Sequence, residues 1–278
     1  MKKNVLITGA STGLGRSVAL SLAASGWRVF AGIRKVADGK ALTAAAEGEL
    51  IPVRLDVAKH DSVVAGIEQV RAVTNGELHG LINNAGVYLG GPLELMQPQE
   101  IEQTFAVNVT GLLLVTRACL PMLRAAQGRI INISSISGLI AMPGVSVYAA
   151  SKHGVEAITD SLRVELDPFG VKVIAVEPGG IKTPIWEKGA ARDAAVPDDA
   201  ETTTLRELYA PLVKLLQKLN ARPGGLPPED VAAVVIDALE SSRPKHRYLV
   251  GKDAKSLSLL GRLPVMLRDR AIASKVWR

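Results

Sequence analysis

Strand-length apolar runs alternate with helical patterns along almost the whole of this 278-residue chain. The apolar runs span residues 4–8, 28–33, 50–57, 78–86, 128–135, 171–179 and 246–251. Helical spacing of apolar residues follows most of them, at 13–26, 60–73, 98 to past 124, 149–167 and 229–240. Strands separated by helices form a parallel sheet that is covered on both faces. The alternation therefore predicts an α/β fold, with a single domain on a doubly wound, mostly parallel, seven-stranded sheet.

One long segment interrupts this alternation. Residues 184–226 are rich in Pro, Gly, Asp and Thr, and a further helix and strand of the same sheet follow them. A linker between domains would not lead back into the same sheet, so we interpret the segment as an irregular excursion that serves as a substrate lid. We place the domain at residues 1–254 and a separate basic tail at 255–278.

Charge and cysteine content exclude some classes of protein. The net charge is +6, but residues 243–278 alone hold ten Lys and Arg against two Asp. The positive charge therefore belongs to the tail, and a nucleic-acid binder is not expected. Cys119 is the only cysteine, which excludes an internal disulfide and fits a reducing compartment. The apolar run near Met1 is too short for a signal peptide core, so we expect a cytoplasmic protein. We expect no metal site.

A glycine-rich turn lies between the first strand and the first helix. In TGASTGLG (8–15), the first glycine allows a tight turn, the second lets the backbone approach a phosphate, and the third allows close packing of the helix. The free amides of a helix N-terminus favour a pyrophosphate. The spacing is GxxxGxG, and glycines alone also fit a turn without a ligand. The residues expected to contact a dinucleotide are Gly9, Ser11, Thr12, Gly13, Leu14 and Gly15.

The end of the second strand indicates which dinucleotide binds. An acidic residue there normally holds the ribose 2′-hydroxyl of NAD, but Ile33 occupies this position and Arg34 follows. A guanidinium binds a 2′-phosphate with two hydrogen bonds, so we predict NADP(H) in preference to NAD(H). The alternative is that Arg34 is a solvated loop charge. Two further strand ends supply cofactor contacts in this prediction, the third strand with Asp56 near the adenine and the fourth with Asn83, Ala85 and Gly86.

The order of motifs resembles one known family. TGASTGLG, NNAG, Asn108, ISSIS, YAASK and PGGIKT follow one another as in the short-chain dehydrogenases/reductases, closely over residues 4–185. The resemblance implies a Rossmann-type fold, an oxidoreductase activity, a dimer or tetramer, and a catalytic tetrad of Asn108, Ser135, Tyr148 and Lys152. It also implies contacts to the nicotinamide half of the cofactor from Tyr148, Lys152, Pro178, Gly179, Ile181 and Thr183.

The chemistry of Tyr148 and Lys152 can be derived from their spacing. Carbonyl reduction needs a hydride from nicotinamide and a proton for the developing alkoxide. Tyrosine has an ordinary pKa of about 10, which is too high for a base near neutrality. Lys152 lies one helical turn beyond Tyr148, and an ammonium about 4 Å away contributes about 4 kcal/mol at an effective dielectric near 20. We therefore expect a lowered Tyr148 pKa in a partly dehydrated site. The resemblance implies that Ser135 holds the substrate oxygen and that Asn108 binds a water that relays protons.

The segment that we expect to line the substrate pocket is apolar. The chain between Ser135 and Tyr148 holds no charged residue, and Met142 and Trp186 are expected to line the pocket. RVFAGIRK and RYLVGKDA look most like the 17β-hydroxysteroid and retinol dehydrogenase branch, so a lipophilic ketone, aldehyde or alcohol is expected. Two alternatives are a 3-oxoacyl-thioester reductase of the same family and a non-catalytic dinucleotide sensor.

The tail and two helices suggest further contacts. Residues 255–278 combine leucines with Arg and Lys, and Pro264 can start a helix there. This tail either makes weak peripheral contact with an anionic membrane or packs on the protein with its charges in solvent. The helices around 100–126 and 149–168 are apolar enough to pack between subunits.

Overall fold

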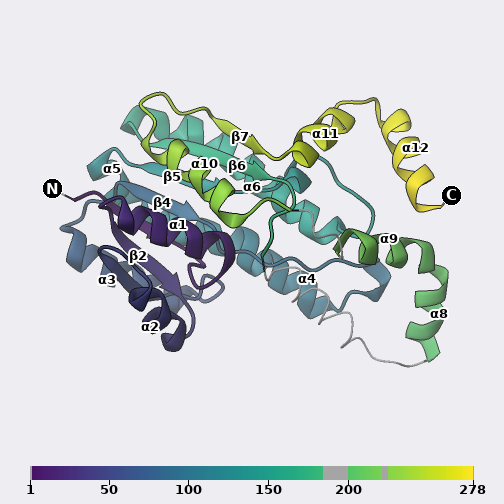
Figure 1. The fold of residues 1–278 in the computed structure, drawn as a ribbon, viewed down its shortest axis with the longest axis horizontal. Coiled ribbons are helices and arrows are strands. Elements are labelled where there is room, and N and C mark those ends of the chain that lie inside the picture. Colours follow the sequence, from purple (N-terminus) through teal and green to yellow (C-terminus); the bar gives the residue numbers. More distant parts are fainter. Residues whose placement is uncertain (1, 184–199, 221–224, 278) are drawn as a thin grey trace.

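Seven parallel strands form one sheet in the described part of the computed structural model, which comprises residues 2–183, 200–220 and 225–277. Their order is β3-β2-β1-β4-β5-β6-β7, and every neighbouring pair is parallel (Figure 1). The strands are β1 (Asn4–Ile7), β2 (Arg28–Ile33), β3 (Leu50–Arg54), β4 (Gly80–Asn83), β5 (Arg129–Ile133), β6 (Lys172–Pro178) and β7 (Arg247–Val250). The predicted doubly wound, single-domain fold is confirmed.

Helices cover both faces of this sheet. One face packs on α1 (Gly13–Ala24) and α10 (Pro228–Glu240), and the other on α3 (His60–Thr74), α5 (Leu112–Ala126) and α6 (Ser146–Leu166). The core divides accordingly into two buried clusters, because alternate side chains of each strand point to opposite faces. Val5 and Ile7 belong to the first cluster, whereas Leu6 between them belongs to the second.

A long helical segment runs from Pro98 to Ala126. It starts as α4 (Pro98–Phe105), where Gln97 and Glu100 form a capping box, passes through a π-helical turn at Ala106–Gly111, and continues as α5. By length and composition it is the one helix among the described residues that is apolar enough to cross a membrane. In this fold it packs on α3 and β4, which makes it part of a cover layer of the sheet.

Several helices were not predicted from the sequence. α2 (Val36–Ala44) buries only Gly39 and Leu42, so it carries too little amphipathic pattern to be recognised. α8 (Ala200–Leu208) and α9 (Ala210–Asn220) lie where we expected irregular chain, which corrects that expectation for this part of 184–226. The rest of the predicted lid lies outside the described residues.

The basic tail is also helical. α11 (Lys252–Gly261) and α12 (Val265–Val276) form it, and Pro264 directly precedes α12 as expected. The predicted domain boundary at residue 254 falls inside α11, where Ala254 is fully buried. Figure 1 shows α8, α9, α11 and α12 together at one end of the long axis, beyond the sheet.

Candidate active site

The glycine turn lies where the strand order changes direction. β1 is hydrogen-bonded to β2 on one side and to β4 on the other, so a crevice opens at the carboxyl ends of β1 and β4. Gly9 has φ 65° and Gly13 has φ 55°, a conformation that favours glycine. A Cβ on Gly15 would lie 2.4 Å from the carbonyl oxygen of Gly9. The turn therefore brings bare backbone to the N-terminus of α1, which suits a pyrophosphate.

Asn84, which sequence reasoning did not select, braces this turn. Its Nδ2 donates to the carbonyl oxygens of Thr8 (3.0 Å) and Gly9 (3.1 Å). The hydroxyl oxygen of Thr8 in turn accepts from the backbone amides of Asn84 (3.0 Å) and Ala85 (2.9 Å). The loop after β4 is thus tied to the glycine turn after β1, and the pair forms one rigid cradle. The NNAG motif indicated this loop, but it did not indicate which of its two asparagines hydrogen-bonds to the glycine turn.

Asn83 points away from this cradle. Its Nδ2 donates to Thr116 Oγ1 and to Asn132 Oδ1, both at 2.9 Å, and Asn132 Nδ2 donates to Thr159 Oγ1 at 2.8 Å. These side chains form a buried polar chain between the sheet and the helices. Because the Asn83 side chain is engaged there, the cofactor contact that we predicted for it is left to its backbone.

Ser135, Tyr148 and Lys152 come together where the carboxyl end of β5 meets the first two turns of α6. The hydroxyl of Ser135 lies close enough to the phenol of Tyr148 to lower its pKa. Lys152 Nζ donates to the carbonyl oxygen of Ile133 (2.8 Å) and lies 5.7 Å from the centroid of the Tyr148 ring. The ring of Tyr88 packs edge-on against that of Tyr148, with centroids 5.0 Å apart. A phenol, a hydroxyl and an ammonium therefore share one small volume beside the cradle.

Asn108 joins the loop after β4 to α6 from the π-helical turn. Its Oδ1 accepts from the amide of Val87 (2.8 Å), and its Nδ2 donates to Val87 O and Ser151 Oγ, both at 3.0 Å. Ser151 Oγ donates to the carbonyl oxygen of Tyr148 (2.7 Å). Gly86 fits between the predicted residues, since its Cβ would lie 3.5 Å from Asn108 Oδ1 and 3.9 Å from Lys152 Nζ. All four residues of the predicted tetrad thus belong to one connected site.

The remaining predicted cofactor contacts lie at both ends of the crevice. Arg34 is exposed just past β2, and Asp56 follows the neighbouring β3, where its Oδ1 accepts from Ala58 N (3.2 Å). At the other end, Pro178 closes β6, while Ile181 bridges to Leu226. Thr183 is the last residue described before the gap.

Asp253, which we did not predict, fixes the chain after β6. Its Oδ2 accepts from the amide of Gly180 (2.8 Å), and a Cβ on Gly179 would meet its carboxylate at 2.2 Å. Gly179 therefore has to be small for this contact to form. The loop after β6 is held by the first turn of α11.

Comparison with known families now shows which family this chain belongs to. The model for the short chain dehydrogenases matches residues 3–194. The chain belongs to the short-chain dehydrogenase family. It is therefore an oxidoreductase of a family that binds a nicotinamide dinucleotide, and the Rossmann-type fold expected from the motifs is confirmed.

Individual relatives agree with this assignment. Retinol dehydrogenase 16 of Mus musculus is 37% identical over 279 residues, covering 96% of this chain and 86% of the relative. NADPH-dependent 3-dehydrocapnine reductase of Ornithobacterium rhinotracheale is 35% identical over 251 residues, covering 88% and 87%. Among solved structures, a short-chain dehydrogenase from Streptomyces avermitilis has a TM-score of 0.79 at 29% identity, covering 99% of this chain and 96% of that one.

The protonation of Tyr148 differs from our expectation for this short-chain dehydrogenase. Burial raises the pKa of Tyr148 to about 12, and the hydrogen bond with Ser135 offsets only part of this effect. Burial also lowers the pKa of Lys152 to about 8, against the influence of Glu156. The expected lowering of the Tyr148 pKa is therefore wrong for the protein alone. Dehydration, which we invoked to strengthen the attraction between the two groups, disfavours both charged forms more.

Met142, which we predicted to contact the substrate, lies in an apolar cluster. Met142 packs against a group of buried residues from the chain after β5, α11 and α12, namely Ile136, Ile140, Ala254 and Ile272. A Cβ on Gly144 would lie 2.5 Å from Leu216 of α9, so α9 approaches the same segment. Trp186, the other predicted substrate contact, lies outside the described residues.

Proposed function

We propose that this chain is an NADP(H)-dependent oxidoreductase that interconverts a lipophilic ketone or aldehyde and its alcohol, with Tyr148 as the acid/base. The observation that carries the proposal is the convergence of Ser135, Tyr148 and Lys152 beside the glycine cradle. The cradle fits a dinucleotide, because the space that a Cβ would fill at Gly9 and Gly15 is already limited by backbone. Bound NADPH supplies the hydride.

The protein groups then handle the oxygen and the proton. The Ser135 hydroxyl donates to the substrate carbonyl oxygen and holds it beside the phenol, as an oxyanion hole does. With a pKa of about 12, the Tyr148 phenol is protonated near neutrality and is ready to give its proton to the developing alkoxide. Lys152, fixed by the Ile133 carbonyl, binds the nicotinamide ribose and supports the phenolate left behind. Asn108 holds the loop at Val87 and accommodates a water that returns a proton through Lys152.

The preference for NADP(H) rests on Arg34. Ile33 leaves no carboxylate at the end of β2, and the relative named NADPH-dependent 3-dehydrocapnine reductase supports the same choice. The test compares kcat/KM for NADPH and NADH in the wild type, Arg34→Ser and the control Lys40→Ser on α2. We expect NADPH to be favoured in the wild type and the control, and Arg34→Ser to lose about 1.5 to 3 kcal/mol of that preference. Better use of NADH by the wild type would refute the choice.

The apolar lining supports a lipophilic substrate. Met142, Ile140 and Leu216 present no charge, and one relative is a retinol dehydrogenase. An NADPH-dependent screen over steroids, retinal, simple ketones and 3-oxoacyl thioesters tests this class. Turnover of retinal or a ketosteroid above that of the others supports the proposal. Turnover of thioesters alone would favour the reductase alternative, and no turnover with intact NADPH binding would favour the sensor.

The proposed assembly is a homodimer or homotetramer in the cytoplasm. Phe105 and Leu113 on α4–α5, Val164 on α6 and Phe169 after it are exposed large apolar side chains on the helices that we expect between subunits. Sedimentation velocity should give a species of at least twice the 29.3 kDa chain mass. Val164→Glu should lower the association constant, whereas a monomer at all concentrations would contradict the proposal.

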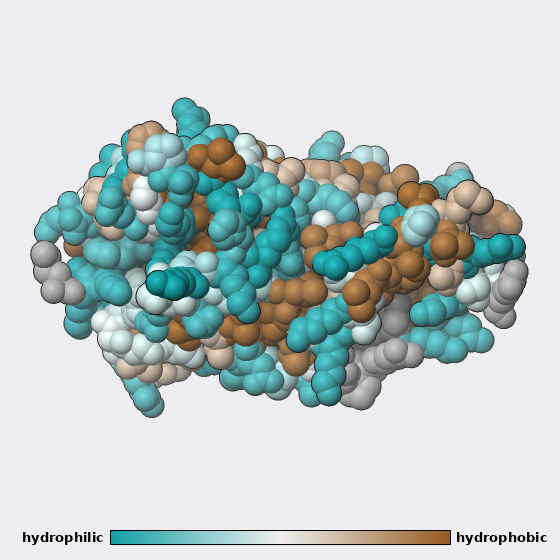
Figure 2. Space-filling model, turned by 90° about the horizontal axis from the view of Figure 1, so that it is seen from above, coloured by the Kyte–Doolittle hydropathy of each residue, from teal (hydrophilic) through white to brown (hydrophobic). Residues whose placement is uncertain are grey.

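The tail is proposed to make weak peripheral contact with an anionic membrane. The inner side of α12 packs, since Ile272 and Val276 are buried, but Met266 is 85% exposed and Leu267 lies beside it. Figure 2 shows apolar and hydrophilic residues interleaved at the end of the molecule that carries α11 and α12. Arg and Lys beside exposed apolar residues suit an anionic surface.

Vesicle flotation decides whether this contact forms. Wild type should float with vesicles that contain phosphatidylserine and not with neutral ones, and Met266→Asp should abolish flotation. A wild type that stays at the bottom with both would mean that the tail charges are merely solvated.

A further inference from the structure

One turn after Lys152, α6 carries a second buried ionisable residue, Glu156. Both side chains lie on the same face of the helix because they are four residues apart. Glu156 Oε2 accepts from Arg247, whereas Oε1 is buried and has no hydrogen-bond partner among the described residues. A buried carboxylate oxygen without a donor is costly, and the charge of Glu156 is paired here by Arg247 through its other oxygen.

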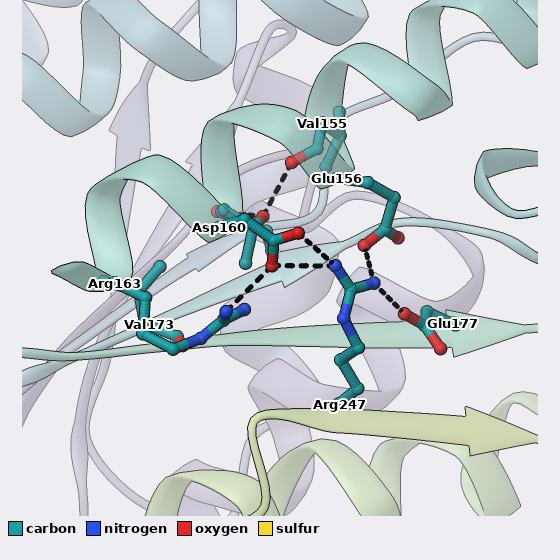
Figure 3. A network of polar contacts seen from close by, with 9 residues as sticks. Val155, Glu156, Asp160, Arg163, Val173, Glu177 and Arg247 are labelled. Atoms are coloured by element: carbon teal, nitrogen blue, oxygen red, sulfur yellow. Dashed lines mark hydrogen bonds and ion pairs between the residues drawn. The ribbon is translucent and has the colours of Figure 1, made fainter.

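Arg247 holds this carboxylate from the far edge of the sheet. It comes from β7 and also donates to Glu177 Oε1 of β6 (2.5 Å) and to both oxygens of Asp160 on α6 (2.7 Å each). Figure 3 shows the three carboxylates arranged around the single guanidinium, with Arg163 as a second donor to Asp160. The cluster locks α6, which carries Tyr148 and Lys152, to β6 and β7.

The charges in this cluster do not balance by themselves. Three carboxylates face two guanidinium groups, those of Arg247 and Arg163. Burial and the proximity of Glu156 both raise the pKa of Glu177, and the guanidinium of Arg247 opposes this effect. The ammonium on the same helical face as Glu156 is that of Lys152.

The surroundings of Lys152 leave Glu156 as its counter-charge. Its Nζ donates to the Ile133 carbonyl and lies 5.7 Å from the centroid of the Tyr148 ring. Neither of these carries a negative charge while Tyr148 is protonated. Burial lowers the Lys152 pKa to about 8, and the charge of Glu156 opposes that effect.

We propose that Glu156, held by Arg247, is a positioning residue for the reaction: its carboxylate, one helical turn from Lys152, favours the charged form of the Lys152 ammonium beside Tyr148. The inference rests on the proposed function, because it assigns a role to Glu156 through Lys152. It also connects the Arg247 cluster at the edge of the sheet to the active site, because a single turn of α6 separates Glu156 from Lys152.

Glu156→Gln tests this role by removing the charge while keeping the shape. If carbonyl reduction needs Lys152 in its charged form, kcat/KM should fall as the pH rises through the pKa of Lys152. The basic limb of the kcat/KM profile should therefore move to lower pH by about one unit in the variant. NMR titration of the ¹³Cε-labelled Lys152 should show the same fall in its midpoint, with no turnover required.

Two further variants separate charge from architecture. Asp160→Asn removes a carboxylate from the same guanidinium one turn farther from Lys152, so it should lower the unfolding midpoint and leave the basic limb in place. Glu156→Asp keeps the charge but withdraws it by one methylene, so its Lys152 midpoint should fall between those of wild type and Glu156→Gln. If Glu156→Gln does not fold, Glu156→Asp is compared with wild type alone, and its midpoint should still be lower.

The outcomes distinguish the two proposals. A Lys152 midpoint that is the same in wild type and the Glu156 variants overturns the positioning role, as does a basic limb that moves equally in Asp160→Asn. If the wild type reduces no carbonyl with NADPH, the proposed function fails, while the NMR titration still tests the coupling of Glu156 to Lys152.

Discussion

The two sides of the site are built differently. The cofactor side consists of short turns at the strand ends, where Gly15 packs on backbone and Asn84 ties two loops with hydrogen bonds. The proposed substrate side consists of α9, α11 and α12, which meet the chain after β5 through apolar contacts and leave residues such as Met266 exposed. Hydrogen bonds and backbone contacts fix positions closely, whereas apolar packing tolerates changes of shape. In the proposed function, the cofactor side would therefore set the reaction, and changes on the proposed substrate side would alter specificity without disturbing it.

The largest effect is expected from a Cβ in the cradle. Gly15→Ala places an atom 2.4 Å from both Gly9 O and Asn84 Nδ2, so backbone has to move. We expect a loss of about 2 to 4 kcal/mol in the free energy of unfolding and at least about 100-fold weaker NADPH binding. Gly261→Ala on the substrate side is the matched control, since its Cβ would meet Ile140 at an ordinary 3.4 Å. Chemical denaturation measures the free energy of unfolding, and fluorescence titration measures NADPH binding. Equal losses in Gly15→Ala and Gly261→Ala would show that the two sides do not differ in their tolerance of an added Cβ.

Lys152→Met should abolish activity on the cofactor side while making the folded protein more stable. The folded-state pKa of Lys152 is about 8, below its ordinary 10.5, so the unfolded chain binds more protons between these pH values. The cost of burying the charge is therefore full below pH 8 and fades as pH rises toward 10.5. We expect Lys152→Met to be inactive but about 1 to 3 kcal/mol more stable at pH 7, with the gap narrowing at pH 10. A variant less stable than wild type at pH 7 would contradict this.

Asn84→Ala should have a smaller effect on the same side. It removes the two donor bonds from Nδ2 to Thr8 and Gly9, which together stabilise the cradle by about 1 to 2 kcal/mol. We expect a raised Kd for NADPH and a kcat within about threefold of wild type at saturating cofactor, because Tyr148 is untouched. Isothermal titration and steady-state kinetics test the split. An unchanged Kd would mean that the turn holds its shape without this brace.

The smallest change is expected on the exposed part of the substrate side. Met266→Ser lies on the outer surface of α12, so the free energy of unfolding should stay within about 0.5 kcal/mol of wild type. NADPH binding should be unchanged as well. A loss comparable to that of Asn84→Ala, measured by the same denaturation experiment, would show that this residue is packed in solution.

The sequence predicted what depends on local pattern. Strand alternation identified all seven strands, and motif order identified Ser135, Tyr148 and Lys152, which the fold brings together. The roles of Asn83 and Asn84 could not be told apart from the sequence. Their side chains point in opposite directions because β4 ends at Asn83, and residue type does not reveal this.

Long-range contacts and burial were beyond sequence reasoning. Arg247 meets Glu156 and Glu177 across 91 and 70 residues of chain, and no local pattern links them. The direction of the Tyr148 pKa was wrong because it depends on how deeply the phenol is buried, which spacing alone does not reveal. The helices α8 and α9 were missed in a stretch judged by its Pro, Gly and Thr content.

Tyr148→Phe is the most direct measurement of the proposed chemistry. The substitution deletes one hydroxyl and keeps the ring against Tyr88 and Lys152, so the cradle should bind NADPH within about threefold of wild type. In a single-turnover assay with the best carbonyl from the screen, NADPH consumption should slow by about 100- to 10,000-fold. A rate within about tenfold of wild type, with NADPH binding intact, would show that Tyr148 does not deliver the proton.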